Sequence, residues 1–284
     1  MKPKKPKQSN KSLSKFLWSG LLLILLVSLI TFLSIQPSNS RNWVTEFAIL
    51  PQVTIENETI TIKKIRDWKY SESEILSQDY ISRTYNVNDL ERVWFLIEPF
   101  GKWEGVAHTY FVFDFKDQPP VSFSIEARRE EGEEYQAFFG LFKKYELIYL
   151  WGTETDFTLR RVVHQKNDVH MYPMTISPEF QKSLFLELAK ATQQLETKPR
   201  FYNTLTSNCT NNLAYHANNI KNDAAPFHYA RFLTGYSGEY VYDLGYIPND
   251  KPYDEVKQQF YINQIVQEVS QNASFSAALR QKLL

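Results

Sequence analysis

The sequence is poor in the residues on which several protein classes depend. Its 284 residues include one cysteine, so neither an internal disulfide scaffold nor a multi-cysteine zinc module can form. The small number of glycines, nine, excludes a collagen-like repeat, and the hydrophobic content of 43% excludes a broadly disordered chain. The HExxH, P-loop and GxGxxG motifs are absent as well. The length is sufficient for one sizeable hydrophobic core or two small ones.

The net charge is zero overall, but it is unevenly distributed, with 32 basic and 32 acidic side chains. Six lysines precede the first acidic residue, Glu46, and they are Lys2, Lys4, Lys5, Lys7, Lys11 and Lys15. The remaining 26 basic and 32 acidic groups give residues 16–284 a net charge of −6. An acidic body repels nucleic-acid phosphates, so we expect no nucleic-acid partner.

One long apolar run, Phe16–Ile35, contains 20 residues and no ionisable side chain. A helix of this length, at about 1.5 Å per residue, covers the roughly 30 Å hydrocarbon core of a bilayer. Because the lysines precede it, the positive-inside rule predicts that residues 1–15 are a cytoplasmic head and that the chain crosses the inner membrane once. Residues 36–42 then form a linker, and residues 43–284 form a periplasmic domain. The alternative is a cleaved signal peptide, although the following SIQPSNSRN lacks an A-x-A site.

The exported part predicts an α+β fold with an antiparallel sheet and packed helices. Residues 107–129 are typical of a hairpin, with the strands AHTYFVFDF and VSFSIEARR on either side of a turn-like KDQPP. Ser177 and Pro178 mark the start of an amphipathic helix that ends at Pro199, and a second helix is expected from about Cys209 to Ile220. Further strands are expected at 59–62, 93–97, 145–151, 157–163 and 169–174, and one or two more helices within 256–284.

Cys209 is the candidate nucleophile. It follows Thr206, Ser207 and Asn208, any of which can cap a helix that begins near the cysteine. The partial positive charge and unpaired N–H groups of a helix N-terminus favour a thiolate and can also hold an oxyanion. The alternative is a buried structural thiol, because cysteine often behaves as a small hydrophobe.

A nucleophilic cysteine needs a base, and the sequence offers five histidines. His216 is two helical turns from Cys209, too far to reach it. His164, His170 and His228 lie in turn-like or loop-like segments and are interpreted as surface or structural residues. His108 is the best candidate, because a hairpin that turns near Asp117 places it opposite Glu126.

A carboxylate beside an imidazole fixes the tautomer of the ring and raises its basicity, so Glu126 is the expected partner of His108. In a register shifted by two residues, Ser124 or Arg128 would face His108 instead. The predicted register also pairs Phe111 with Phe123, on a face expected to be core. A metal site would need His164, His170 and unidentified further ligands, so we expect neither a metal nor another cofactor.

Several strings of the sequence resemble a known family. They are IRDWKY at 65–70, then AHTYFVFDF, SFSIEARREEGEEY, YELIYLWGTETDFTLR and PRFYNTLTSNCTNNL, in this order between about residues 55 and 250. Together they resemble the Lnb N-terminal periplasmic domain family. The resemblance implies a circularly permuted papain-like fold of the NlpC/P60 type, with His108 as the base, Cys209 as the nucleophile and Glu126 as the orienting residue.

The resemblance also implies a function. The namesake enzymes of the family move an acyl chain from a phospholipid to the terminal amino group of a lipoprotein. They carry a membrane-embedded C-terminal part, and no apolar run of spanning length occurs in 256–284. We therefore expect a membrane-anchored periplasmic cysteine acyltransferase or hydrolase that forms a thioester intermediate, with membrane lipid and a lipoprotein as candidate substrates.

Four further residues are candidates for substrate contacts. Asn208 and Tyr202 lie near Cys209 in the sequence and are candidate oxyanion donors. Arg128 and Arg129 lie near Glu126 and are candidates to bind a lipid phosphate, with structural ion pairing as the alternative for at least one of them. Two other functions stay open: a cysteine peptidase or amidase that acts on cell wall or protein, and a non-catalytic periplasmic binding domain.

Overall fold

The computed structural model describes residues 11–101 and 103–284 and divides into two units between Pro37 and Ser38. The first unit contributes helix α1 (Lys11–Ser34). Within the described residues, Ser14–Ser34 is a helix long and apolar enough to cross a membrane by length and composition. It covers the predicted span except for its last residue. Residues 1–10 of the predicted basic head lie outside the described residues. The second unit, Ser38–Leu284, begins inside the predicted linker 36–42.

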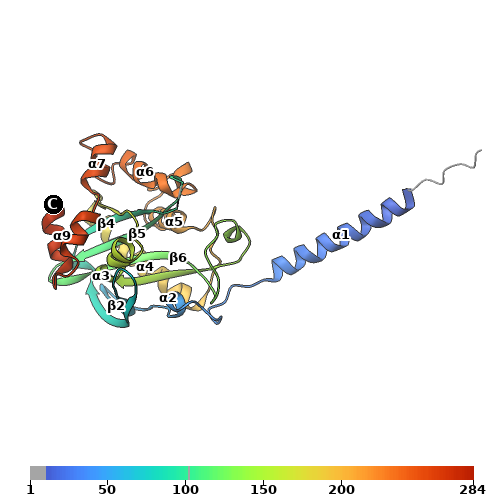
Figure 1. The fold of residues 1–284 in the computed structure, drawn as a ribbon, viewed down its shortest axis with the longest axis horizontal. Coiled ribbons are helices and arrows are strands. Elements are labelled where there is room, and N and C mark those ends of the chain that lie inside the picture. The colour runs from blue at the N-terminus through green and yellow to red at the C-terminus, as the bar shows by residue number, and fades with distance from the viewer. Residues whose placement is uncertain (1–10, 102) are drawn as a thin grey trace, which may run out of the picture. The chain divides into compact units, whose positions relative to one another are not determined.

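The second unit is built on a sheet that contains eight strands in the part of the chain that the structure describes (Figure 1). The strand order is β1-β2-β7-β6-β5-β4-β8, and β3 pairs with β2. Neighbouring strands are antiparallel except β2 and β7, which share one parallel bridge. The strands are β1 (Gln52–Glu56), β2 (Thr59–Tyr70), β3 (Ile75–Asn86), β4 (Leu90–Pro99), β5 (Ala107–Phe115), β6 (Gln118–Arg128), β7 (Glu146–Thr153) and β8 (His170–Pro173).

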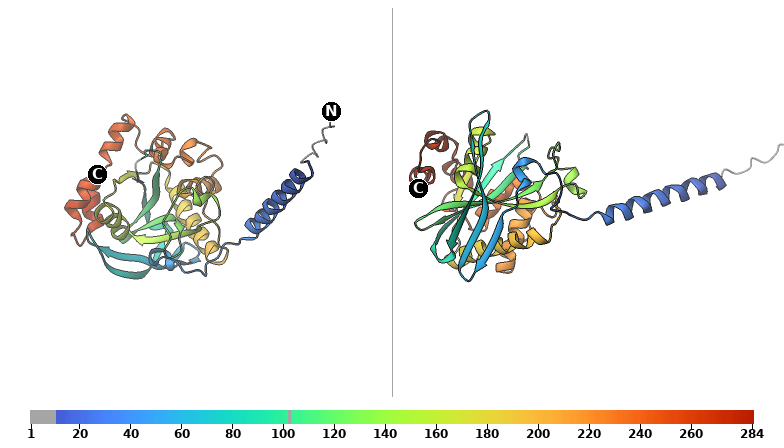
Figure 2. Two further views of the ribbon diagram at one scale, coloured as in Figure 1. Left: turned by 45° about the vertical axis from the view of Figure 1, so that its right-hand side comes forward. Right: turned by 90° about the horizontal axis from the view of Figure 1, so that it is seen from below.

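Helices pack on both faces of the sheet (Figure 2). Phe185 of α4 contacts the rings of Phe113 and Trp151 on one face, and Phe157 of α3 contacts Tyr110 on the other. The sheet is therefore the middle layer of the fold. Besides α1, the helices are α2 (Thr45–Ala48), α3 (Glu154–Leu159), α4 (Pro178–Thr197), α5 (Cys209–Ile220), α6 (Ser237–Asp243), α7 (Tyr253–Gln259), α8 (Asn263–Val269) and α9 (Phe275–Leu283).

The predicted hairpin is confirmed as β5 and β6, in the predicted register. Phe111 pairs with Phe123 and Tyr110 pairs with Ser124. The turn is shorter than expected, because only Lys116 and Asp117 separate the strands. Both faces are buried rather than one, since the side chains of Tyr110 and Ser124 are as inaccessible as those of the phenylalanine face.

The strand predicted at 157–163 is wrong. This segment is helical: α3 ends at Leu159 and a π-helical turn continues from Arg160 to His164. Valines 162 and 163 suggested a strand, because β-branched residues favour extended backbone. The helix start lies before these valines: the Thr153 side chain accepts a hydrogen bond from the Asp156 N–H and caps α3.

The predicted helices of the second half are confirmed. Ser177 caps α4, and α5 begins at Cys209 with Asn208 as its cap. The C-terminal segment forms the three short helices α7, α8 and α9 within the described residues, where one or two were expected. Arg280 fixes α9 to the sheet layer through ion pairs of 2.7 Å with Asp114 and Glu154.

Candidate active site

His108, the second residue of β5, lies beside two polar side chains of β6. Its Nε2 is 3.1 Å from Glu126 Oε1 and 2.7 Å from Ser124 Oγ. The Ser124 hydroxyl donates a 2.7 Å hydrogen bond to the same carboxylate oxygen. The register that pairs Tyr110 with Ser124, continued by two residues, puts the expected Glu126 opposite His108. Ser124, expected only in a shifted register, contacts the ring as well, from the diagonal position.

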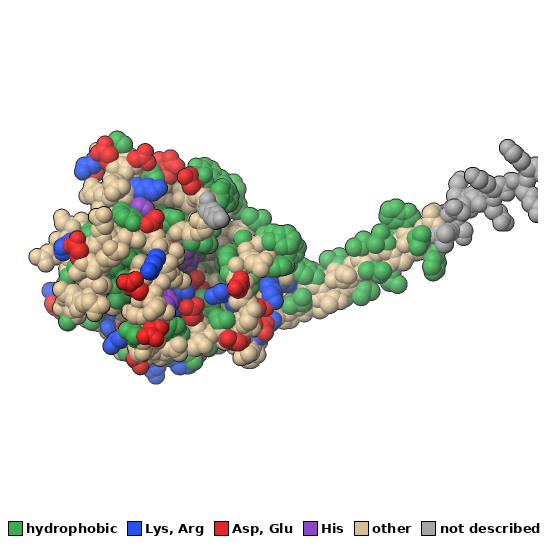
Figure 3. All heavy atoms as spheres, viewed as in Figure 1, with side chains coloured by type: hydrophobic (Ala, Val, Ile, Leu, Met, Phe, Trp, Pro, Cys, Tyr) green, Lys and Arg blue, Asp and Glu red, His purple; other side chains and the backbone are tan. Residues whose placement is uncertain are grey.

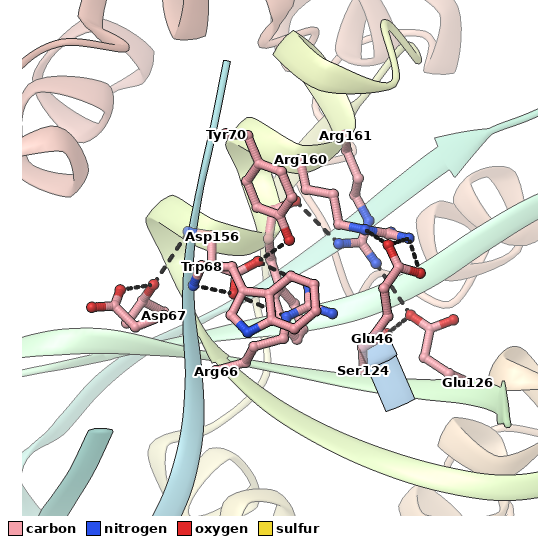
Figure 4. A network of polar contacts seen from close by, with 12 residues as sticks. Glu46, Arg66, Asp67, Trp68, Tyr70, Ser124, Glu126, Asp156, Arg160 and Arg161 are labelled. Atoms are coloured by element: carbon pink, nitrogen blue, oxygen red, sulfur yellow. Dashed lines mark hydrogen bonds and ion pairs between the residues drawn. The ribbon is translucent and has the colours of Figure 1, made fainter. Parts of the chain in front are cut away.

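The Glu126 carboxylate forms a second ion pair, with Arg161. Arg161 extends from the π-helical turn that follows α3 and donates a 3.3 Å hydrogen bond from Nη2 to Glu126 Oε1 (Figure 4). The same guanidinium is fixed by Glu98 Oε2 at 2.7 Å and lies over the Tyr110 ring at 4.2 Å. Because Arg161 is buried and paired on two sides, it gives the carboxylate one orientation.

Cys209 is the first residue of α5 and is 5% exposed. The first turn of this helix packs on β5, where Thr210 Oγ1 lies 3.1 Å from Thr109 Oγ1. Burial by itself raises the pKa of the thiol, but the interactions with His108 and Thr109 outweigh it and lower the pKa. Since Nε2 of His108 faces Ser124 and Glu126, its other ring nitrogen, Nδ1, is left for the thiol.

The histidine and the carboxylate stabilise each other's charged forms. Burial alone lowers the pKa of His108, yet Glu126 and then Cys209 raise this pKa to about 10. Burial raises the pKa of Glu126, but His108 and Arg161 hold it well below its usual range. The ring is therefore an imidazolium at neutral pH, and the thiol beside it is biased towards thiolate.

A cavity of about 530 Å³ opens onto this group, and His108, Glu126 and Cys209 all line it. Tyr202 lines it too, and its hydroxyl lies 3.2 Å from that of Tyr135. Burial, Tyr135 and the nearby Cys209 raise the pKa of Tyr202 well above its ordinary value, so its hydroxyl keeps its proton. Tyr202 and Cys209 line the same cavity, and the role of Tyr202 as an oxyanion donor stays a prediction.

The structure gives Asn208 a different role from the expected one. Its Oδ1 accepts from the Asn211 N–H at 2.7 Å, and its Nδ2 donates to the carbonyls of Thr204 and Arg231 at 2.9 Å. The amide is fully used in capping α5 and in fixing two loops. Asn208 therefore positions Cys209, and its side chain has no donor left for an oxyanion.

The two candidate arginines are consecutive residues with different surroundings: Arg128 ends β6 and Arg129 follows it. Arg129 lines the cavity, where its Nη2 is 3.7 Å from Glu46. The expectation that Arg128 meets a lipid phosphate is wrong, because this side chain is 1% exposed, does not line the cavity and donates hydrogen bonds to the backbone carbonyls of Phe47 and Ala48. Its role is structural.

The other histidines have structural contacts. His216 is buried between the Tyr149 hydroxyl, at 2.7 Å, and Glu187, at 3.0 Å. His164 and His170 bond backbone carbonyls of distant segments, and His228 accepts from the N–H of Ala230, two residues along the chain. Within residues 11–101 and 103–284, no group of three or more histidine, cysteine or acidic residues is arranged to hold a metal ion.

Sequence reasoning missed several members of the site. Arg161 lies in the segment predicted as a strand, and Glu98 directly follows the predicted apolar strand 93–97 without a signal of its own. Tyr135 carries no signal of its own. Ser124 was detectable, because the shifted register named it as an alternative partner of His108.

A buried thiol at a helix N-terminus, beside a histidine and carboxylate pair on an antiparallel sheet, defines an α+β domain with a candidate thiol site. The model of the Lnb N-terminal periplasmic domain family matches residues 77–235, just over half of the chain and including all the candidate site residues. The chain belongs to this family. No curated protein and no solved structure matches it. The family and the apolar helix α1 fit a single-pass membrane protein with a periplasmic domain.

Proposed function

We propose that this protein is a membrane-anchored, periplasm-facing cysteine acyltransferase or hydrolase with a permuted papain-like site. The observation that carries the proposal is the arrangement of Cys209, His108 and Glu126 at one cavity. The ionisation of each group suits the chemistry. The pKa of the thiol is lowered, the imidazole is protonated, and the ionised carboxylate orients the imidazole ring.

The reaction begins with attack of the Cys209 thiolate on the carbonyl carbon of an acyl ester. The carbon–sulfur bond forms and the carbon–oxygen bond breaks, while the His108 imidazolium gives its proton to the departing alkoxide. The product is a thioester on Cys209 and a neutral His108. An amine or a water molecule then attacks the thioester, His108 takes its proton, and the thiolate and imidazolium are restored.

Negative charge on the carbonyl oxygen during each step needs hydrogen-bond donors. The donors we assign are the Tyr202 hydroxyl and the N–H groups of Cys209 and Thr210, which precede the Asn211 N–H that Asn208 caps. Of the arginines that line the cavity, we assign Arg129 to an anionic part of the substrate.

Transfer to a lipoprotein amine is the acyltransferase reaction that we propose, with the inner membrane as the location and the N-terminus in the cytoplasm. It rests on the family and on the basic residues before α1. The acyl-enzyme on Cys209 is the intermediate that this reaction requires.

The test uses the full chain in detergent with a phospholipid whose ester-linked acyl chain carries a terminal alkyne. We expect hydroxylamine-sensitive label on the Cys209 peptide, absent in Cys209→Ala, strongly reduced in His108→Ala and retained in Glu187→Gln, which alters the other His–Glu pair. Adding a peptide with an S-diacylglyceryl cysteine at its free N-terminus distinguishes label on the amine, a transferase, from free fatty acid, a hydrolase. Absence of label, together with a native thiol that iodoacetamide alkylates no faster than the denatured one, would overturn the proposal.

A further inference from the structure

Large apolar side chains are exposed around the mouth of the cavity. Six of them lie between 44% and 78% exposed, values unusual for residues of this size in a folded unit. They come from four loops that also supply cavity-lining residues. We call them the apolar rim: Trp103, Phe138, Phe139, Phe142, Leu205 and Phe227.

The four loops form one continuous border. Thr204 donates from Oγ1 to the Ala137 carbonyl at 2.6 Å, which joins the loop of Leu205 to that of Phe138. Asn208 bonds the Arg231 carbonyl at 2.9 Å, and the Gly235 N–H bonds the Gly105 carbonyl at 3.2 Å. These contacts join the loop of Phe227 to the first two and to the loop of Trp103.

Three phenylalanines of the rim form an exposed cluster of rings. The rings of Phe138, Phe139 and Phe142 contact one another, at 5.7 Å between the centroids of the first two and 5.2 Å between those of Phe138 and Phe142. They cluster on the loop surface while Tyr135 and Ala137 of the same loop turn into the cavity. Hydrophobic side chains gather at the upper right of the folded unit in Figure 3.

A short stretch of chain connects α1 to the folded unit. Only Ile35–Pro37 separate α1 from the folded unit, a stretch of about 10 Å even when fully extended. The chain then attaches at the base of the Phe138 loop. The Asn42 carbonyl accepts from the Glu131 N–H at 2.7 Å, and Val44 donates to the Arg129 carbonyl at 3.0 Å.

We propose that the apolar rim docks on the surface of the lipid bilayer in which α1 is anchored, so that the mouth of the cavity opens onto the membrane. Exposed phenylalanine and tryptophan are the side chains that enter the boundary between headgroups and acyl chains, about 5–10 Å deep. The chain that leads from α1 joins the folded unit close to the Phe138 loop, since Val44 bonds Arg129, where this loop begins. The docking surface stands on its own geometry, and its use for substrate entry rests on the proposed function.

The experiment measures quenching by membrane lipids in the full chain, reconstituted in phosphatidylcholine vesicles with doxyl-labelled acyl chains. In a Cys209→Ala background, a fluorophore is attached after Phe138→Cys or Phe227→Cys. The matched control is Leu76→Cys, on β3, which is 59% exposed and lies on a strand that does not line the cavity. We expect at least about threefold stronger quenching at 138 and 227 than at 76.

Equal quenching at the three positions, or none at 138 and 227, would overturn the proposal. So would a fluorescence change at 138 that depends on protein concentration in detergent without lipid, because it would assign the rim to contact between two copies. Quenching needs no turnover, so a chemically inert protein can still dock. A second pair of variants, Phe138→Ser and Phe227→Ser, should slow acyl-enzyme formation from vesicle lipid while leaving alkylation of Cys209 by iodoacetamide unchanged.

Discussion

The charge of Glu126 is predicted to set the protonation of His108, and replacing it by glutamine tests this directly. Glu126→Gln keeps the shape of the side chain and an oxygen that can accept from Ser124, but it removes the charge that lies 3.1 Å from Nε2. Two unit charges about 4 Å apart interact by about 4 kcal/mol at an effective dielectric constant near 20. The His108 and Glu126 side chains are 13% and 19% exposed, so water screens part of this energy.

If about half of it is lost in the variant, roughly 2 kcal/mol, the pKa of His108 falls by about 1.5 units. From about 10 in the native protein it would reach about 8.5 in the variant. Because Arg161 keeps its ion pair with Glu98, we expect the surrounding structure to be unchanged in the variant.

The assay is NMR titration of the full chain with selectively labelled histidine, in which His108→Gln identifies the signal. The matched control is Glu187→Gln, which removes the carboxylate 3.0 Å from His216 and should leave the His108 titration unchanged. A native His108 that titrates near its ordinary pKa of 6.5 would refute the charged arrangement. A shift below about 0.5 unit in Glu126→Gln would refute the assignment of Glu126.

Three further outcomes follow from the same contacts. Because the pKa of His108 is raised in the fold, its contribution to the free energy of unfolding is complete below pH 6.5 and is lost as the pH rises through about 10. The free energy of unfolding, measured by chemical denaturation, should therefore fall with pH between these values, and His108→Gln should reduce the slope of this fall. The rate of Cys209 alkylation by iodoacetamide should reach half its maximum below pH 9, the ordinary thiol value, and a midpoint at or above it would contradict the lowered pKa. Arg128→Ala leaves buried carbonyls without donors and should cost about 3 kcal/mol, or about 6–12 °C in thermal denaturation, against no measurable change for the exposed Lys63→Ala.

The parts of the site that follow from short-range rules could be predicted from the sequence. The position of Cys209 came from a polar cap followed by an amphipathic helix, and the proximity of His108 and Glu126 came from the alternation of a hairpin. Both rules connect residues close in the chain. That Cys209 approaches His108 is a long-range property, which the comparison of the five histidines and the family resemblance predicted without a rule that connects the two segments.

The parts that could not be predicted depend on tertiary contacts. Arg161 reaches Glu126 because α3 continues into a π-helical turn, and its apolar neighbours Val162 and Val163 gave the opposite signal. Strand alternation does not separate Arg128 from Arg129, because Glu126, which shares the face of Arg128, lines the cavity. The difference is a tertiary one: Arg128 is covered by α2 and donates to the carbonyls of Phe47 and Ala48, whereas Arg129 lies one residue past the end of β6 and lines the cavity.

The charges of the site alternate along a single path. Glu98, Arg161, Glu126 and His108 follow one another within contact distance, and the thiol of Cys209 completes the path. Transfer of a proton from thiol to imidazole leaves the net charge of these five groups unchanged, so the buried region gains no unbalanced charge. The transfer only places a positive ring between two negative neighbours. A fixed alternation of charge therefore favours the ion pair even where burial opposes an isolated thiolate, and it does so before any substrate binds.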